Sequence, residues 1–185
     1  MMRELADNIL DIAQNSISAG ASLTEVHIRI SHADDRITFT FKDNGCGMSE
    51  EMVKTVLEPF TTSRKTRKVG LGLPLLKQTA EMTGGEIGIT STVGVGTEVT
   101  ATFGLGHIDR PPMGDVAGAW FSLVVMNPDT DFLFTYDYDG KDFTFDTRII
   151  RETVAPIPLN QMEIAAWIKE CIHTEINELH GGIFS

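Results

Sequence analysis

The chain has 185 residues, a formal net charge of −11 and 42% hydrophobic residues. A chain of this length and composition buries a core of ordinary size, which excludes disordered and fibrous classes. The acidic balance argues against general binding to nucleic acid or to an anionic membrane. No apolar stretch is long enough to span a bilayer and no signal sequence follows Met1, so we expect a cytoplasmic protein. Cys46 and Cys171 lie far apart, so neither a disulfide framework nor a zinc site is expected.

The first predicted element is a helix over residues 5–20. Apolar residues recur there at helical spacing, and Gly20 closes the pattern. On the polar side of this helix, Asn8, Asp11 and Asn15 follow one another at steps of three and four residues. Side chains at this spacing stack along one face of a helix, so the three can converge on one object.

Two alternating runs, at residues 26–30 and 37–41, predict an antiparallel hairpin with one buried face. The second strand ends at Asp43, directly ahead of Gly45 and Gly47 in "DNGCGM". Glycines at alternate positions let a backbone turn sharply, or let a flat ligand approach without a Cβ in the way. Because an Asp-Asn-Gly run taken alone is most often a turn, both interpretations stay open at this point.

Two helices and a second hairpin follow in the predicted order. Ser49 is typical of an N-cap and starts a short helix. Residues 69–85 predict another helix, with Pro74 at its first position. Strands at residues 87–89 and 99–103 complete a pattern of helix, hairpin, helix, loop, helix and hairpin. This order predicts an α+β sandwich with helices on one face of a mixed or antiparallel sheet, an architecture that fixes no function by itself.

The "GLGLP" stretch, residues 70–74, leads straight into the second of these helices. The first N–H groups of a helix lack partners and its dipole end is positive, so such a junction can bind phosphate; a tight loop is the alternative. Four cations lie just upstream, namely Arg64, Lys65, Arg67 and Lys68. In an otherwise acidic chain they fit a mobile flap that closes over a polyphosphate, although such a run is usually a solvated loop.

Residues 107–185 predict strands and a helix that extend the same core. After a linker, we expect an apolar strand at residues 119–126 and an aromatic strand at 132–138. Asp139-Gly140 is a strong hairpin turn signal, and a capped helix is expected at about residues 160–179. The acidic residues around this turn approximate the spacing of a calcium loop, but strands flank them where helices would be needed.

Four stretches, in this order, resemble the GHKL superfamily of gyrase-type ATPases, heat-shock chaperones, sensor histidine kinases and MutL proteins, together with the anti-sigma-factor serine kinases. "LDIAQNSISAGA" resembles the N box, with a MutL-like "NSISAGA", and "DNGCGM" resembles the adenine-binding box. "EPFTTS" with "GLGLPLLKQTAEMTGG" resembles the lid and second glycine box, and "GVGTEVTATF" the third. The resemblance covers residues 1–106 and implies a Bergerat-type ATP-binding domain, with residues 107–185 as a hairpin-plus-helix extension on the same core.

The resemblance implies a Mg-ATP site with a role for each of its residues. Asp43 would accept a hydrogen bond from the adenine amino group, Gly45 and Gly47 would give the base room, and Thr97 would support it through water. Asn15 would supply its side-chain oxygen to Mg²⁺, a hard cation that prefers such ligands. The full set of nucleotide-binding residues implied is Asn15, Asp43, Gly45, Gly47, Met48, Phe60, Lys65, Gly70, Leu71, Gly72, Leu73 and Thr97.

Asp11 is the candidate catalytic residue and also a departure from the family pattern. Gyrase-type ATPases and the anti-sigma kinases place a Glu four residues before the metal-binding Asn, where this chain has the shorter Asp11. Sensor kinases usually carry an Asn there, so an acid favours a chain that activates water or a hydroxyl. The lid departs as well, with Lys68-Val69 in place of the usual Gly-Thr.

With 14 residues before Asn15, we expect no room for the helical hairpin that carries the phosphoacceptor histidine of a sensor kinase. We therefore expect a free-standing cytoplasmic kinase of histidine or serine type, or an ATPase, that acts on a separate protein partner; a homodimer is a further option. The alternatives are an ATP-gated switch with slow or no hydrolysis and a degenerate nucleotide binder. The histidines, which we interpret as structural or surface residues, are His27, His32, His107, His173 and His180.

Overall fold

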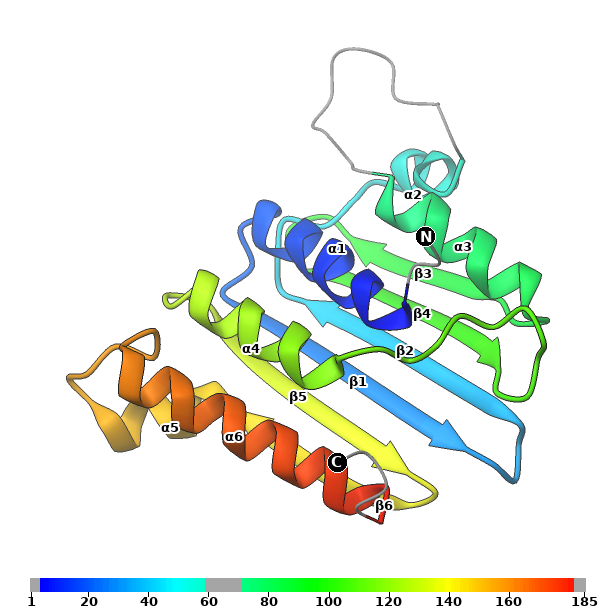
Figure 1. Ribbon diagram of the computed structural model, residues 1–185. Helices are drawn as coiled ribbons and strands as arrows, with labels where there is room; N and C mark the ends of the chain where they lie inside the picture. The colour runs from blue at the N-terminus through cyan, green and yellow to red at the C-terminus, as the bar shows by residue number, and fades with distance from the viewer. Residues whose placement is uncertain (1–3, 59–70, 182–185) are drawn as a thin grey trace.

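Six strands form one mixed sheet in the computed structural model, which describes residues 4–58 and 71–181 (Figure 1). The strand order is β3-β4-β2-β1-β5-β6. Neighbouring strands are antiparallel except for β1 and β5, which are parallel. The predicted α+β class is confirmed. The strands are β1 (Leu23–Ser31), β2 (Arg36–Asp43), β3 (Ile87–Thr92), β4 (Gly96–Gly104), β5 (Asp131–Tyr138) and β6 (Lys141–Asp146).

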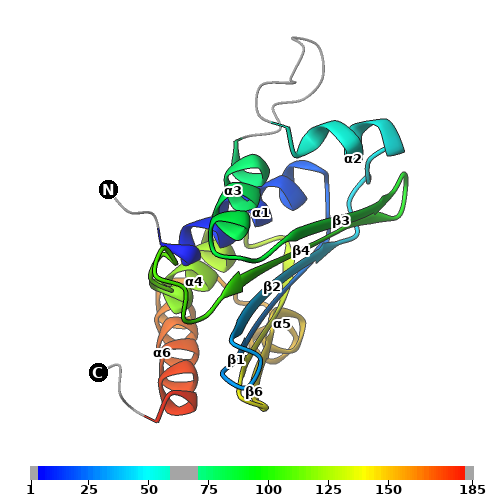
Figure 2. The ribbon, with the colours of Figure 1, turned by 90° about the vertical axis from the view of Figure 1, so that its right-hand side faces the viewer.

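Helices cover one face of this sheet, as expected from the sequence. Figure 2 shows α1, α3, α4 and α6 together on the same side of the strands. In the described part of the chain, none of the helices is long and apolar enough to cross a membrane. The helices are α1 (Leu5–Ser18), α2 (Glu50–Val56), α3 (Gly72–Met82), α4 (Val116–Met126), α5 (Thr147–Val154) and α6 (Met162–Leu179).

The core lies between the helices and the covered face of the sheet. Alternate residues of β1 and β2 point into it, because successive side chains of a strand face opposite sides. Phe39 of β2 is fully buried and meets Phe103 of β4 edge to face, with 5.4 Å between the ring centroids. From the helix side, Ile9 and Ile12 of α1 are buried in the same cluster. Burial of each such side chain contributes about 1.5–3 kcal/mol, which holds α1 against the sheet.

The prediction of a strand at residues 119–126 is wrong, because this segment is the helix α4. Asp115 caps it by accepting a hydrogen bond of 2.8 Å from the N–H of Gly118. α4 packs against α1 and against α6, so it is buried on more than one side. A short apolar run is typical both of a buried strand and of a buried helix. Here the run is apolar because α1 and α6 bury more than one side of the helix. α5, which follows β6 directly, was not predicted.

The predicted hairpin at Asp139-Gly140 is confirmed, and the calcium loop is not formed. Both turn residues have positive φ, 52° and 82°, as a two-residue hairpin loop requires. The Asp139 carboxylate accepts from the backbone N–H of His32 and contacts its ring Nδ1, both at 2.8 Å. Asp137 accepts from the N–H of Gly140. These carboxylates are bound by the protein, and no group of three potential metal ligands occurs among the described residues.

α3 begins at Gly72, so Pro74 is its third residue and not its first as predicted. A proline is compatible with this place because the first four N–H groups of a helix have no partner within it. The helix ends at Met82 and the chain turns at Gly84, with a φ of +72°, within the glycine pair at residues 84–85 that the sequence predicts as the stop. Leu71 alone separates the start of α3 from the segment 59–70, which lies outside the described residues.

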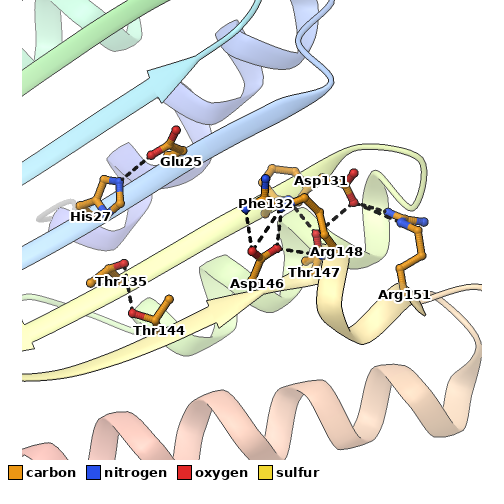
Figure 3. A network of polar contacts seen from close by, with 10 residues as sticks. All are labelled: Glu25, His27, Asp131, Phe132, Thr135, Thr144, Asp146, Thr147, Arg148 and Arg151. Atoms are coloured by element: carbon orange, nitrogen blue, oxygen red, sulfur yellow. Dashed lines mark hydrogen bonds and ion pairs between the residues drawn. The ribbon is translucent and has the colours of Figure 1, made fainter. Parts of the chain in front are cut away.

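Polar contacts tie α5 to the strands beside it (Figure 3). Arg148 lies 2.6 Å from Asp146, and its hydrogen bond holds the pKa of that carboxyl below the usual value. Arg151 contacts Asp131 at the start of β5, at 3.0 Å, and donates to the carbonyl of Pro128. Because these side chains are partly solvated, the ion pairs add little to stability. They fix the position of α5 more than they stabilise the fold.

Candidate functional site

A cavity of about 240 Å³ lies between the second half of α1, the ends of β2 and β4, and the helices α2 and α3. Much of its wall is apolar, with Ile12, Phe41 and Val99 among the lining residues. The exposed thiol of Cys46 also lies there. The cavity brings together several of the residues predicted from the sequence, which are Asn15, Asp43, Gly47, Met48, Leu73 and Thr97.

Asp43, the last residue of β2, is held by two short hydrogen bonds. The hydroxyl of Ser16 on α1 donates to Oδ2 at 2.7 Å, and the N–H of Gly45 donates to Oδ1 at 2.8 Å. Ser16 is buried, so its bond is shielded from water. A carboxylate has about four acceptor positions, and these two bonds leave others for a donor inside the cavity. Asp43 is thus an oriented acceptor at the edge of a largely apolar space.

Two hydroxyl side chains lie on the strands beside Asp43, and one of them, Thr97, lines the cavity. The sheet register places Asp43 opposite Thr97 on β4, and Thr97 opposite Ser91 on β3. The two hydroxyl oxygens of Ser91 and Thr97 lie 2.8 Å apart. Ser91 also accepts from the N–H of Met48 at 2.8 Å, which ties the loop after β2 to the sheet. Ser91 therefore positions both Thr97 and the loop.

The two glycines of this loop lie close to other parts of the protein. A Cβ on Gly45 would lie 2.8 Å from the Cβ of Ala19, and one on Gly47 would lie 2.1 Å from the carbonyl oxygen of Thr92. Gly47 also has a φ of +69°, which other residues rarely adopt. Both glycines let the loop pack against its neighbours. Gly47 lines the cavity, but a Cβ there would meet the Thr92 backbone, so room for a ligand at these glycines stays a prediction.

Asn15 and Asp11 lie one turn apart on α1, but only Asn15 lines the cavity. The amide nitrogen of Asn15 is buried without a hydrogen-bond partner in the described part of the protein. Asp11 lies beside the start of α3, where a Cβ on Gly72 would be 3.2 Å from its own Cβ. Asn8 does not join them, because it is buried and its amide donates to the carbonyl of Leu5.

The remaining predicted residues lie near the start of α3 or cannot be placed. Gly72 is buried, whereas Leu71 is 60% exposed and does not line the cavity. The predicted contacts Phe60, Lys65 and Gly70 lie outside the described residues, as do the other cations of the basic run. A flap over the cavity therefore stays a prediction.

Two residues that matter for the geometry were not predicted. Ser16 directly follows Asn15, and its spacing of four from Ile12 could have placed it on the buried side of the helix. Ser91 could not have been found without the register of β3 and β4. Together with Asp43 they make a site suited to a flat ring that donates an N–H, since apolar walls surround one oriented acceptor.

Residues 1–107 match the model of the family described as histidine kinase-, DNA gyrase B- and HSP90-like ATPase. Sporulation kinase D of Bacillus subtilis is 38% identical over 94 residues, which are 51% of this chain and 18% of that protein. Sensor histidine kinase AruS of Pseudomonas aeruginosa is 33% identical over 106 residues, or 52% of this chain and 10% of that protein. The chain thus spans less than a fifth of the length of these relatives.

Solved structures show the same fold at low sequence identity. The MutL ATPase domain of Aquifex aeolicus, solved with ADP, has a TM-score of 0.51 and is 18% identical; the alignment covers 79% of this chain and 64% of that one. The N-terminal domain of a DNA repair protein has a TM-score of 0.53 and is 14% identical, with coverage of 76% and 51%. These likenesses extend beyond the segment matched by the family and support the fold alone.

Proposed function

Because the chain belongs to the family of histidine kinase-, DNA gyrase B- and HSP90-like ATPases and carries its ATP-binding domain, we propose that the cavity beside Asp43 holds the adenine of Mg-ATP. The observation that carries this proposal is the carboxylate of Asp43, which two hydrogen bonds orient. The adenine amino group would donate to this carboxylate. Ile12, Phe41 and Val99 would cover the faces of the ring, which favours a flat base over a flexible ligand.

Asn15 fits a role toward the phosphates and Mg²⁺. Asn15 lines the cavity and its amide nitrogen has no partner among the described residues, so this donor is left for an acceptor such as a phosphate oxygen. An amide oxygen is a ligand that Mg²⁺ accepts. When bound, the metal would neutralise charge on the transferring phosphoryl group. Asn15 itself would orient the phosphate end of the nucleotide relative to the adenine at Asp43.

Asp11 would act on the nucleophile. It lies one turn before Asn15 on α1 and beside the start of α3. Phosphoryl transfer passes through a loose transition state, in which aligning the nucleophile matters more than removing its proton early. A carboxylate in this place would accept a hydrogen bond from an attacking hydroxyl or water and hold it in line.

The proposed acceptor is a separate protein or water. No histidine lines the cavity, and His27, His32 and His180 are bound by Glu25, Asp139 and Tyr136 respectively. The test is incubation of the purified chain with γ-labelled ATP, alone and with a lysate of its source. Label on another protein supports a kinase, and release as free phosphate supports an ATPase. Label on the chain itself, at one of its histidines, would contradict the proposal.

An ATP-gated switch is the second candidate, because α4 packs directly against α1, the helix that carries Asp11 and Asn15. A movement of α1 on nucleotide binding would therefore reach the rest of the helix layer. A switch predicts no transfer of label, but a change in hydrogen-exchange protection of α4 when ATP replaces ADP. Transfer of label without such a change would exclude the switch.

A further inference from the structure

Four polar side chains form a row across the helix-covered face of the sheet, at the end where β2 and β3 end and where β1 and β4 begin (Figure 1). The register pairs Thr24 of β1 with Asp43, Asp43 with Thr97, and Thr97 with Ser91. Asp43 and Thr97 line the nucleotide cavity, whereas none of the residues of β1, all of which are described, lines it. Asp43 therefore has the cavity on its β4 side and Thr24 on its β1 side.

Thr24 carries a buried hydroxyl without a partner. The residue is fully buried, and its Oγ1 makes no hydrogen bond within the described part of the chain. Most buried polar groups in proteins are hydrogen-bonded, because a buried group that lacks a partner lowers stability. A valine has nearly the same shape and is equally suited to a strand, yet it has no polar group to satisfy. A hydroxyl kept at this place therefore calls for a partner.

The sheet places Asp43 directly opposite this hydroxyl. The N–H of Asn44 donates to the carbonyl of Leu23 at 3.4 Å, so these two residues form a hydrogen-bonded pair. Such pairs alternate along an antiparallel ladder with pairs that are not hydrogen-bonded, and Thr24 and Asp43 are the next pair. Side chains approach each other most closely in a pair of this second kind. The Thr24 hydroxyl is thus a direct neighbour of the Asp43 side chain.

The carboxylate of Asp43 has an acceptor position to spare. A carboxylate offers about four such positions. Ser16 and Gly45 each donate to one, and the adenine amino group would donate to a third from the cavity. The terminal torsion of an Asp side chain is broad, so the carboxylate can turn at little cost. A small turn that accompanies the bond to adenine would bring the fourth position to Thr24.

We propose that Thr24 is a positioning residue, whose hydroxyl donates to the carboxylate of Asp43 while the adenine amino group donates to it from the cavity. This inference rests on the proposed nucleotide function. The hydroxyl lacks a partner in the protein alone and gains one in the complex. Because the gain belongs to the complex only, the hydroxyl strengthens nucleotide binding and makes the protein alone less stable than a valine would.

Thr24→Val tests this directly, because it removes the hydroxyl and keeps the shape of the side chain. It should raise the urea midpoint of the chain by about 0.5 M, since a polar group without a partner is removed. In calorimetric titration it should weaken Mg-ATP binding about fivefold, since a bond made in the complex is lost. Thr24→Ser keeps the hydroxyl and loses a buried methyl group. It should therefore lower the urea midpoint and keep the Kd within about twofold of the native value.

Thr147→Val is the matched control. Thr147 is also fully buried, but its hydroxyl accepts a hydrogen bond of 2.8 Å from the N–H of Phe132. Removing a hydroxyl that has a partner should lower the urea midpoint and leave the Kd for Mg-ATP unchanged. A second control combines Thr24→Val with Asp43→Ala. Thr24→Val should have no further effect on the Kd in that chain, because its effect passes through Asp43.

The inference is overturned if Thr24→Val binds Mg-ATP as the native chain does, or if it lowers the urea midpoint. It is also overturned if Thr24→Ser loses as much affinity as Thr24→Val, or if Thr24→Val weakens binding equally in the Asp43→Ala chain. Failure of the proposed function gives a different result, since Asp43→Ala would then itself bind Mg-ATP with native affinity. Weaker binding by Asp43→Ala with unchanged binding by Thr24→Val removes only the role of Thr24.

Discussion

Asp43 shows how its neighbours prepare one acceptor before any ligand arrives. Ser16 and Gly45 each hold one carboxylate oxygen, and they come from the helix on one side and the loop on the other. Because the carboxylate is already oriented, little side-chain entropy is lost when a ligand donates to it. Ser16 is thus a positioning residue, whose effect on binding should pass through Asp43.

Removing the Ser16 hydroxyl should weaken nucleotide binding without abolishing it. Ser16→Ala deletes one donor to Asp43, at a cost of about 1 kcal/mol, which corresponds to about fivefold in the Kd for Mg-ATP. Calorimetric titration measures this. Ser122→Ala is the control, because its hydroxyl donates to a carbonyl within α4, away from the cavity. A Kd for Ser16→Ala equal to that of the control would show that Asp43 needs no such support.

Substitution of Asp11 should separate binding from chemistry. Asp11→Asn keeps the size of the side chain and removes its charge, so ATP affinity should stay nearly constant while phosphoryl transfer or hydrolysis falls about a hundredfold. Asp11→Glu restores the longer acid of gyrase-type sites. A rise in turnover would show that the native side chain is too short to reach the nucleophile. Turnover is followed with γ-labelled ATP. If Asp11→Asn turns over ATP as fast as the native chain, Asp11 only solvates the helix face.

Several residues of the site could be predicted from spacing along the chain. Asn15 was identified from its place on the polar face of a helix, and Asp43 from its place at a strand end ahead of two glycines. Ser91 could not be predicted, since only the register of two strands brings it to Thr97. Nucleotide contacts at these residues remain predictions, because only binding measurements test them.

Among the elements, α4 shows why an apolar run alone does not specify a strand. It has polar caps and helical neighbours, α1 and α6, which bury more than one of its sides. The hairpins, by contrast, could be predicted because alternation and turn residues such as Asp139-Gly140 are local signals. The packing partners of α4 are distant in sequence, so no local pattern reports them.

The buried side of α4 should be far more sensitive to substitution than its exposed end. Leu123 is 1% exposed and Met126 is 65% exposed. Leu123→Ala should lower the free energy of unfolding by about 2–5 kcal/mol, because it leaves a cavity between packed elements. Met126→Ala should change it by about 0.5 kcal/mol or less. Urea unfolding of both variants gives the comparison, and equal losses would argue that the segment does not pack as described.

The end of α6 should make the fold less stable in mild acid. Burial, with the nearby His32 as a second cause, lowers the pKa of His180 in the folded protein, so the unfolded chain binds this proton more readily. The stability that the neutral His180 contributes to the fold is therefore present above the ordinary His pKa of about 6.5. It is lost as the pH falls below this value. His180→Gln, which does not titrate, should show a smaller drop in the urea midpoint between pH 7.5 and 5.5. A drop as large as that of the native chain would contradict this assignment.

At the scale of the whole molecule, residues before and after position 107 share one sheet and one core. β5 pairs in parallel with β1, and Phe134 and Trp120 belong to the same buried cluster as Ile9 and Phe39. The sequence predicted an extension on the same core but not this pairing, because parallel strands are joined by long connections that leave no turn signal. A domain boundary after residue 106 stays a prediction.

The direct test of the central claim is calorimetric titration of Mg-ATP into the native chain, Asp43→Ala and Asp109→Ala. Asp109 is exposed in the loop before α4, so its variant controls for the loss of one negative charge. We expect Asp109→Ala to bind as the native chain does. Asp43→Ala should bind about tenfold to a hundredfold more weakly, since an unpaired adenine amine costs about 1–3 kcal/mol. Equal affinity of the two variants for Mg-ATP would contradict adenine recognition by Asp43.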